Sequence, residues 1–126
     1  MQKILLIEDN LDLRNIYAIR LIADHYDIVT ASDGEEGLAK AISDSPDLIL
    51  SDIMMPKVSG FEMIRLLKET KSTAHIPVIF LTALSDPERQ KESLQLGADA
   101  YFVKSEVSIE DIVAEIHKFL DPLKEK

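Results

Sequence analysis

The sequence lacks cysteine, so neither a disulfide nor a thiolate metal site can form. It also lacks long apolar runs, and none approaches the roughly 20 residues that a membrane-spanning helix needs. The N-terminal segment contains a single lysine and a short apolar run that ends in an acid, which is not the pattern of a signal peptide. These absences favour a cytoplasmic protein that does not associate with membranes.

Basic residues are a minority, with 14 lysines and arginines against 23 aspartates and glutamates and a net charge of −9. A surface of this sign repels phosphate backbones, so we expect no direct binding of nucleic acid. The glycines form no phosphate-binding loop of the G-x-x-x-x-G-K-[ST] type. The three histidines have no metal-ligand spacing and are expected on the surface; they are His25, His75 and His117.

Five short apolar runs alternate with longer amphipathic stretches, without an internal repeat or a linker. Continuous apolar runs of this length are typical of strands buried on both faces of a parallel sheet. The predicted strands are residues 4–7, 27–31, 48–50, 78–81 and 100–103. The predicted helices are residues 11–24, 35–43, 61–69, 87–97 and 109–119.

Two of these helices have clear end signals in the sequence. Ser108 is a good cap for the last helix, and Asp86 followed by proline is typical of a helix start. Gly97 is expected to end the helix before it in a left-handed conformation. The alternation of strands and helices in one domain of 126 residues predicts a doubly wound (βα)₅, flavodoxin-like fold. We expect a parallel five-stranded sheet in the order 2-1-3-4-5, with right-handed crossovers.

Polar residues follow four of the predicted strands, at the end where such sheets carry their sites. Glu8 and Asp9 follow the first strand, Asp52 the third, Thr82 the fourth and Lys104 the fifth. The winding of a 2-1-3-4-5 sheet reverses between its first and third strands, and sites lie at that reversal. We therefore expect these five side chains to surround one crevice.

The charges of this set indicate what it would bind. Three carboxylates and one ammonium carry −2 in total, which one divalent cation brings to zero. Oxygen ligands without histidine or cysteine favour Mg²⁺ or a similar hard cation. A carboxylate is already a nucleophile, so Asp52 could accept a phosphoryl group without a separate catalytic base.

The same residues are the marks of a known family. Over essentially its whole length the chain resembles the receiver domain of bacterial response regulators, with its CheY-like fold. The matching segments are Glu8-Asp9, Asp52 to Pro56 continuing to Gly60, Thr82-Ala83, Leu96 to Asp99, and Lys104. Each segment alone is a weak signal, but their order and spacing together are highly specific.

The resemblance implies a role for each acid. Asp52 would be the phospho-acceptor, supplied by the phosphohistidine of a sensor histidine kinase or a phosphotransfer protein. Asp9 and Asp52 would bind Mg²⁺ directly, together with the backbone carbonyl of Met54. Glu8 would act through a metal-bound water. Residues 1–126 would form a single receiver domain without an effector domain, ending just after the last helix at Asp121; a trimmed longer chain is the alternative.

The resemblance also implies a switch. Thr82 and Lys104 would bind the phosphoryl group, and Tyr101 would turn inward as Thr82 moves, although Tyr101 could instead be a core aromatic. Phosphorylation would then change the face formed by the fourth helix, fifth strand and fifth helix, which would contact a downstream protein target or a second copy of the chain. The chain would be a signalling protein that catalyses only its own phosphoryl transfer and dephosphorylation.

Three departures from the family pattern bear on this reading. Ser105 stands where the family usually has a proline after a cis bond; we predict a trans Lys104–Ser105 bond, with a strained cis bond as the alternative. Glu8 replaces an aspartate, but its longer side chain still reaches a metal. Met54 and Leu84, two residues after Asp52 and Thr82, are apolar and would orient an attacking water poorly, so slow self-dephosphorylation is expected.

Three other functions compete with this one. An unphosphorylated interaction module of the same fold would have lost an acid or Lys104, and neither is lost. Phosphohydrolases related to haloacid dehalogenases carry D-x-D after the first strand, where this chain has Glu8-Asp9-Asn10. A flavodoxin-like FMN carrier would have a loop rich in serine and threonine there, and acids would repel the flavin phosphate.

Overall fold

A computed structural model describes residues 1–120 as five parallel strands and five helices, so the end at Asp121 lies outside the described residues. The strands are β1 (Lys3–Ile7), β2 (Asp27–Ala31), β3 (Leu48–Ser51), β4 (Val78–Thr82) and β5 (Ala100–Val103). The helices are α1 (Leu11–Ala23), α2 (Gly34–Asp44), α3 (Gly60–Glu69), α4 (Pro87–Gln95) and α5 (Ile109–Phe119). The sheet order is β2-β1-β3-β4-β5, so the predicted doubly wound topology is confirmed.

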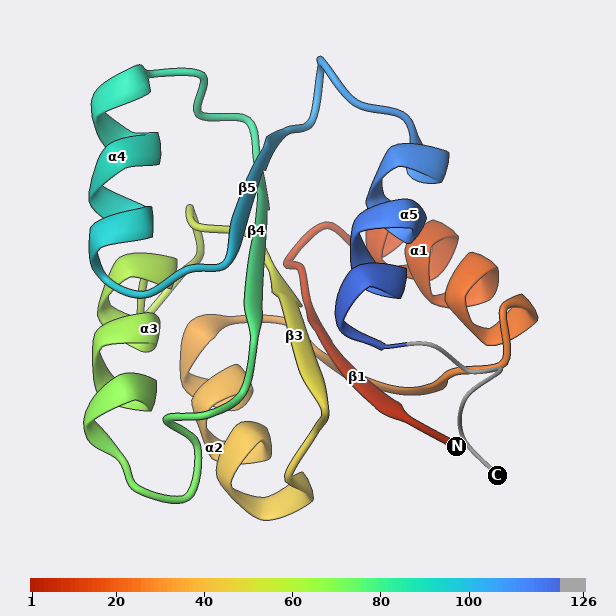
Figure 1. The fold of residues 1–126 in the computed structure, drawn as a ribbon, viewed down its shortest axis with the longest axis horizontal. Helices are drawn as coiled ribbons and strands as arrows, with labels where there is room; N and C mark the ends of the chain where they lie inside the picture. Colours follow the sequence, from red (N-terminus) through yellow and green to blue (C-terminus); the bar gives the residue numbers. More distant parts are fainter. Residues whose placement is uncertain (121–126) are drawn as a thin grey trace.

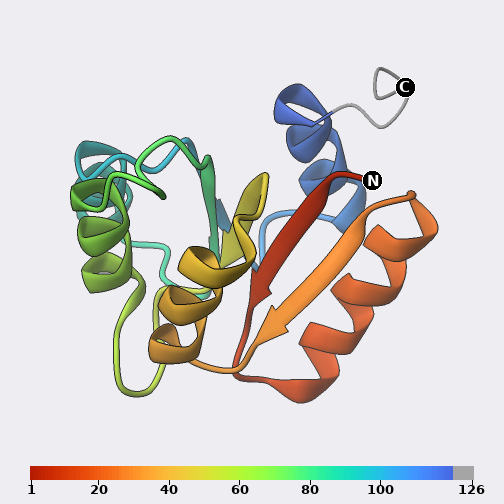
Figure 2. The same cartoon turned by 90° about the horizontal axis from the view of Figure 1, so that it is seen from below.

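Helices cover both faces of the sheet in three layers. Figure 1 shows α1 and α5 on one face and α2, α3 and α4 on the other, and Figure 2 shows the same division from below. Each face has its own apolar core: Leu5 and Ile49 belong to one cluster, Leu6 and Leu50 to the other. Among the described residues, no helix is long and apolar enough to cross a membrane.

Burial differs between the central and the edge strands. The apolar residues of β1, β3 and β4 are fully buried, as predicted. The prediction of burial on both faces is wrong for β2 and β5, which are mostly half-buried. These two strands lie at the edges of the sheet, where each has a neighbouring strand on one side only.

The helix starts are fixed by side-chain caps. Each N-cap side chain accepts a hydrogen bond from a backbone N–H in the first turn; the caps are Asn10, Asp33, Ser59, Asp86 and Ser108. Ser108 also forms a reciprocal capping box with Asp111. Gly97 has φ +113°, so the left-handed end predicted after α4 is confirmed.

The loop between β3 and α3 packs tightly against two glycines. A Cβ added at Gly34 would lie 1.9 Å from the carbonyl oxygen of Val58, and one at Gly60 would lie 2.7 Å from the Cα of Ile53. Because both obstacles are backbone atoms, neither can turn aside as a flexible side chain could. The loop that follows Asp52 is therefore held in place by close backbone approaches from the starts of α2 and α3.

This packing predicts that Gly34→Ala destabilises the protein by about 1–3 kcal/mol, the usual cost of an overpacked site. Alanine is the better helix former, so any loss of stability measures the clash and not helix propensity. Gly37→Ala is the matched control, because the atoms nearest its Cβ would be side-chain atoms of Ile7 and not backbone atoms. Urea denaturation should give a lower free energy of unfolding for Gly34→Ala than for Gly37→Ala. Equal stabilities would contradict the close packing.

Candidate functional site

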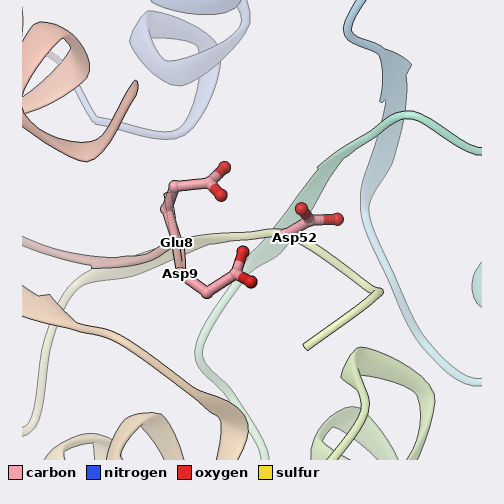
Figure 3. A group of neighbouring side chains, drawn as sticks. All are labelled: Glu8, Asp9 and Asp52. Carbon is pink, nitrogen blue, oxygen red and sulfur yellow. The ribbon is translucent and has the colours of Figure 1, made fainter. Parts of the chain in front are cut away.

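Three carboxylates meet where β1 and β3 end. Glu8, Asp9 and Asp52 each offer an oxygen within 4.8 Å of the other two, and Figure 3 shows their carboxylates drawn together. Glu8 and Asp52 are buried, with 3% and 7% of their surface exposed, whereas Asp9 is exposed. The pairing of β1 with β3 brings these acids together, so the prediction that these three side chains meet is confirmed.

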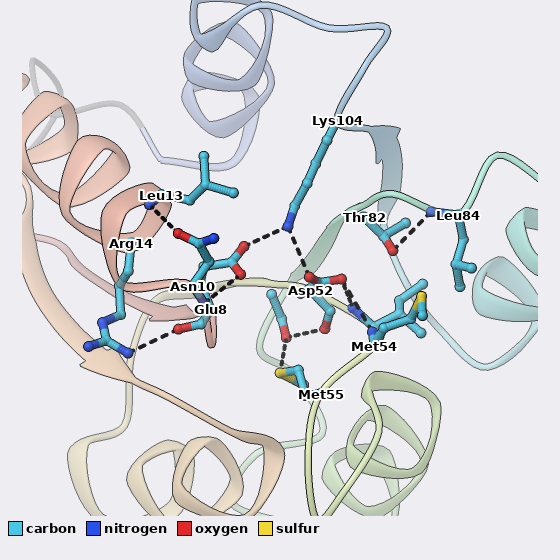
Figure 4. A network of polar contacts seen from close by, with 12 residues as sticks. Glu8, Asn10, Leu13, Arg14, Asp52, Met54, Met55, Thr82, Leu84 and Lys104 are labelled. Atoms are coloured by element: carbon cyan, nitrogen blue, oxygen red, sulfur yellow. Dashed lines mark hydrogen bonds and ion pairs between the residues drawn. The ribbon is translucent and has the colours of Figure 1, made fainter.

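Lys104 bridges two of these acids. Its Nζ donates to Glu8 Oε1 at 2.8 Å and to Asp52 Oδ2 at 3.0 Å, as Figure 4 shows. The backbone N–H of Lys104 donates to the carbonyl of Thr82 at 2.7 Å, which continues the pairing of β4 with β5 by one residue. The lysine side chain therefore reaches from the end of the edge strand into the acidic cluster.

Lys104 and Glu8 change each other's pKa. Burial raises the pKa of Glu8, and the hydrogen bond from Lys104 opposes that rise. For Lys104, burial acts to lower the pKa, but the hydrogen bonds to Glu8 and Asp52 outweigh it and the pKa is raised. The ion pair therefore keeps Lys104 charged and partly offsets the cost of a buried Glu8 carboxylate.

The carboxylate of Asp52 has a fixed orientation. Its Oδ1 accepts hydrogen bonds from the backbone N–H groups of Ile53 at 2.6 Å and Met54 at 3.2 Å, while Oδ2 faces Lys104. The hydroxyl of Ser51 donates to the Asp52 carbonyl at 2.7 Å. The side chain of Met54 is itself exposed, so only its backbone takes part in holding the acid.

Thr82 and Tyr101 both contact Leu84 in the loop between β4 and α4. The buried Thr82 accepts a hydrogen bond on Oγ1 from the Leu84 N–H at 3.3 Å. The half-buried Tyr101 donates its hydroxyl to the Leu84 carbonyl at 2.7 Å and packs its ring against the core. Thr82 thus lies beside Asp52 in Figure 4, but among the described residues its hydrogen bond is to the loop and not to the acid.

The departure at Ser105 is accommodated by an ordinary turn. The Lys104–Ser105 bond is trans, as predicted. The N–H of Glu106 donates to the carbonyl of Val103 at 2.9 Å and closes the turn that contains Lys104 and Ser105. A proline is therefore not required at Ser105 for Lys104 to face the acids.

Two residues at the site were missed by the sequence analysis. The N–H of Asn10 donates to Glu8 Oε2 at 3.1 Å, and Nη1 of Arg14 donates to the Glu8 carbonyl at 3.0 Å. The contact between Asn10 and Glu8 could have been predicted, because Asn10 is a good helix cap and follows the acids directly in the sequence. The three histidines are exposed, as predicted.

The acidic cluster fits a hard divalent cation. The donors are all oxygen, and three carboxylates with one ammonium leave a charge of −2. Asp9 is exposed, which leaves room for the water ligands that Mg²⁺ usually keeps. Of the described residues that could hold a metal, these three acids are the group that the structure brings together.

The ion pair predicts that Lys104→Met raises the pKa of Glu8 further, because the main contact that lowers it is removed. We expect an NMR titration of the metal-free protein to show the Glu8 carboxyl losing its proton at a higher pH in the variant. Lys118→Met, which removes an exposed lysine paired with Glu115, is the matched control and should leave Glu8 unchanged.

The same change makes stability depend on pH. A carboxyl whose folded pKa lies above its unfolded pKa favours folding when protonated, and this stability is lost as pH rises through the folded value. The free energy of unfolding of Lys104→Met should therefore fall more steeply than that of the unaltered protein as pH rises from the ordinary glutamate pKa of 4.5. An unchanged or lowered Glu8 pKa in the variant would contradict the account.

Comparison with known proteins places this site in a family. Residues 4–117 match the response regulator receiver domain. The structure resembles that of the chemotaxis response regulator CheY4 of Vibrio cholerae, with a TM-score of 0.87 and 31% identity over 95% of this chain and 99% of that one.

Curated relatives agree with this match. The response regulator ArlR of Staphylococcus saprophyticus is 38% identical over 95% of this chain, and a gliding motility regulatory protein of Myxococcus xanthus is 39% identical over 92%. The chain spans 53% of the first relative's length and 15% of the second's. The chain belongs to the receiver domain family of response regulators, the phosphorylation-activated switches of two-component signalling.

Proposed function

We propose that Asp52 accepts the phosphoryl group by which this receiver domain is switched. The observation that carries the proposal is the position of its carboxylate, which is held by two backbone N–H groups and bridged through Lys104 to Glu8. The donor is the phosphohistidine of a sensor histidine kinase or of a phosphotransfer protein. An Asp52 oxygen attacks phosphorus, the phosphorus–nitrogen bond breaks, and its electron pair stays on the imidazole.

The charges around Asp52 suit this transfer. Asp52 loses its carboxylate charge in forming the acyl phosphate, and about two negative charges arrive with the phosphoryl group. Lys104, already within hydrogen-bonding distance of Asp52, faces the incoming oxygens. Catalysis then consists of positioning and charge stabilisation, without a separate base.

Mg²⁺ is the cofactor of the proposed transfer. Asp9, Asp52 and the backbone carbonyl of Met54 would hold it, and it would supply positive charge to the phosphoryl oxygens. Both carboxylate oxygens of Glu8 are occupied by hydrogen bonds, one from Lys104 and one from Asn10, which supports a contact through water for Glu8. Asp9 is the exposed acid and accordingly the first that an arriving cation would meet.

Thr82 and Tyr101 connect the proposed phosphoryl group to the surface. When the Thr82 hydroxyl turns to bind a phosphoryl oxygen, it gives up its contact with the Leu84 N–H. The Leu84 carbonyl is the acceptor for Tyr101, so the same loop movement frees the tyrosine to turn inward. The face made by α4, β5 and α5 changes with it and controls binding to a downstream protein or to a second copy.

The exposed side of α1 suits a protein phosphodonor. Four of its side chains are large, apolar and more than half exposed: Leu11, Ile16, Ile19 and Ile22. Helix α1 begins shortly after Glu8 and Asp9, so the N-terminal end of this apolar surface, at Leu11, is next to the acids in the sequence. A protein that covers it would bring its phosphohistidine to Asp52. We place the domain in the cytoplasm, where its kinase partner would act, and assign it no activity on other substrates.

The phosphorylation test uses a small-molecule phosphodonor, acetyl phosphate, with Mg²⁺ and intact-mass measurement. We expect an adduct of one phosphoryl group in the unaltered protein and none in Asp52→Asn, which keeps the shape of the side chain but not its nucleophile. Chelation of Mg²⁺ should also abolish the adduct. An adduct of equal yield in Asp52→Asn, or none in either protein, would contradict the proposal.

The phosphoryl group should be lost slowly, because Met54 and Leu84 are apolar and cannot orient an attacking water. Replacement of the exposed Met54 by asparagine supplies a hydrogen-bonding group and should speed the loss severalfold. The decay of the adduct after removal of the phosphodonor measures both rates. A lifetime of only seconds in the unaltered protein, or no acceleration in Met54→Asn, would count against the assignment of these two positions.

A further inference from the structure

Arg14 reaches the acidic cluster from outside it. The side chain extends from the second turn of α1, is half-buried, and donates Nη1 to the backbone carbonyl of Glu8 at 3.0 Å. Figure 4 shows this contact on the side of Glu8 that faces away from Asp52. The guanidinium therefore does not touch the proposed phosphoryl group or metal, but it does touch the backbone that carries two of the acids.

The contact completes a set of hydrogen bonds that engages every polar atom of Glu8. Its N–H donates to the carbonyl of Ala31 at 3.0 Å, and its two carboxylate oxygens accept from Lys104 and Asn10. The remaining polar atom is the carbonyl, which Arg14 occupies. This carbonyl belongs to the peptide unit between Glu8 and Asp9. The hydrogen bond from Arg14 therefore restrains the orientation of the peptide plane next to the Cα of Asp9.

Arg14 differs from the other arginines in what it binds. Arg20, Arg65 and Arg89 each form ion pairs with acids on the surface. Within the described part of the chain, Arg14 has no carboxylate at ion-pair distance, and its hydrogen bond is to a neutral carbonyl. A half-buried guanidinium committed to one carbonyl beside a cluster of acids indicates a role in shaping that cluster.

We propose that Arg14 is a positioning residue for the Mg²⁺ site, which sets the Glu8–Asp9 peptide so that the carboxylate of Asp9 faces Asp52. The inference rests on the proposed binding of Mg²⁺ by these acids. Asp9 is exposed, and within residues 1–120 its carboxylate has no hydrogen-bond partner, so the peptide plane is the main constraint on where that carboxylate lies. Partners that orient metal ligands typically change metal affinity 10–100-fold when they are removed, by order of magnitude.

The direction in which Mg²⁺ affinity changes when Arg14 is removed distinguishes a positioning role from a purely electrostatic one. Arg14 carries a positive charge close to a cation site, so its charge alone repels Mg²⁺. If charge were its only influence, removing it would tighten Mg²⁺ binding. If Arg14 positions the peptide, its removal weakens Mg²⁺ binding in spite of the lost repulsion.

The test is titration of metal-free Arg14→Met with MgCl₂, followed by NMR shifts of the backbone amides near Asp52. Methionine keeps an unbranched apolar stem but neither the charge nor the donor. We expect the dissociation constant for Mg²⁺ to rise about tenfold. An unchanged or lower dissociation constant would overturn the proposal.

Two further proteins make the result decisive. Arg20→Met removes the same charge from the same helix but contacts Asp24 and Glu110 instead of Glu8, and its Mg²⁺ affinity should not fall. If Arg14→Met does not fold, the same titration is done with Arg14→Gln, whose side chain is too short to reach the carbonyl. The same rise in the dissociation constant is expected, and an unchanged or lower value would again overturn the proposal. Absence of Mg²⁺ binding in the unaltered protein would instead refute the proposed metal site, so the two failures are distinguishable.

Discussion

Mutual repulsion of three carboxylates is the constraint on which the rest of the site depends. At the 4.8 Å limit that contains Glu8, Asp9 and Asp52, two unit charges repel by about 3.5 kcal/mol at an effective dielectric near 20. Two of these acids are also buried, which adds a desolvation cost. The hydrogen bonds from Lys104 to both buried acids offset part of this repulsion and desolvation cost, and a divalent cation would offset the remainder. The net negative charge of the cluster therefore favours binding of a cation, which the proposed phosphoryl transfer needs.

The fold supplies this concentration of charge through its topology and its tight loops. The reversal of winding places β1 beside β3, so acids that lie more than forty residues apart in sequence follow adjacent strand ends. The close backbone approach at Gly34 and Gly60 holds the loop after Asp52, and the N–H groups of that loop fix the acid in turn. Stability and the proposed function are therefore linked at this end of the sheet: the same backbone packing that stabilises the loop also orients Asp52, the proposed acceptor.

Much of the fold and of the candidate site could be predicted from the sequence, because hydrophobic periodicity and polar residues at strand ends are local signals. The alternation of apolar runs with amphipathic stretches predicted a doubly wound sheet and, as its usual arrangement, the strand order. The polar residues that follow the strands, among them Asp9, Asp52 and Lys104, then predicted the meeting of these side chains. Contacts that depend on side-chain direction were not predictable in the same way. Arg14 is one turn into a helix and looks like a surface residue; only the way α1 packs on the sheet aims it at the Glu8 carbonyl. Thr82 was placed correctly beside the acids, but its hydrogen bond to Leu84 depends on the path of a loop that no periodicity describes. The partial exposure of β2 and β5 follows from their place at the sheet edges, which the predicted strand order already implied; the expectation of burial on both faces came from the apolar runs alone.

The central claim is that the phosphoryl group is carried by Asp52 and not by a neighbouring acid or hydroxyl. Borohydride reduction tests it directly, because it converts an aspartyl phosphate to homoserine and leaves serine and threonine phosphates intact. After treatment with acetyl phosphate and Mg²⁺, reduction and proteolysis, tandem mass spectrometry should find homoserine at position 52. Homoserine at Asp9, or a phosphate retained on Ser51 or Thr82 with no homoserine at position 52, would contradict the account.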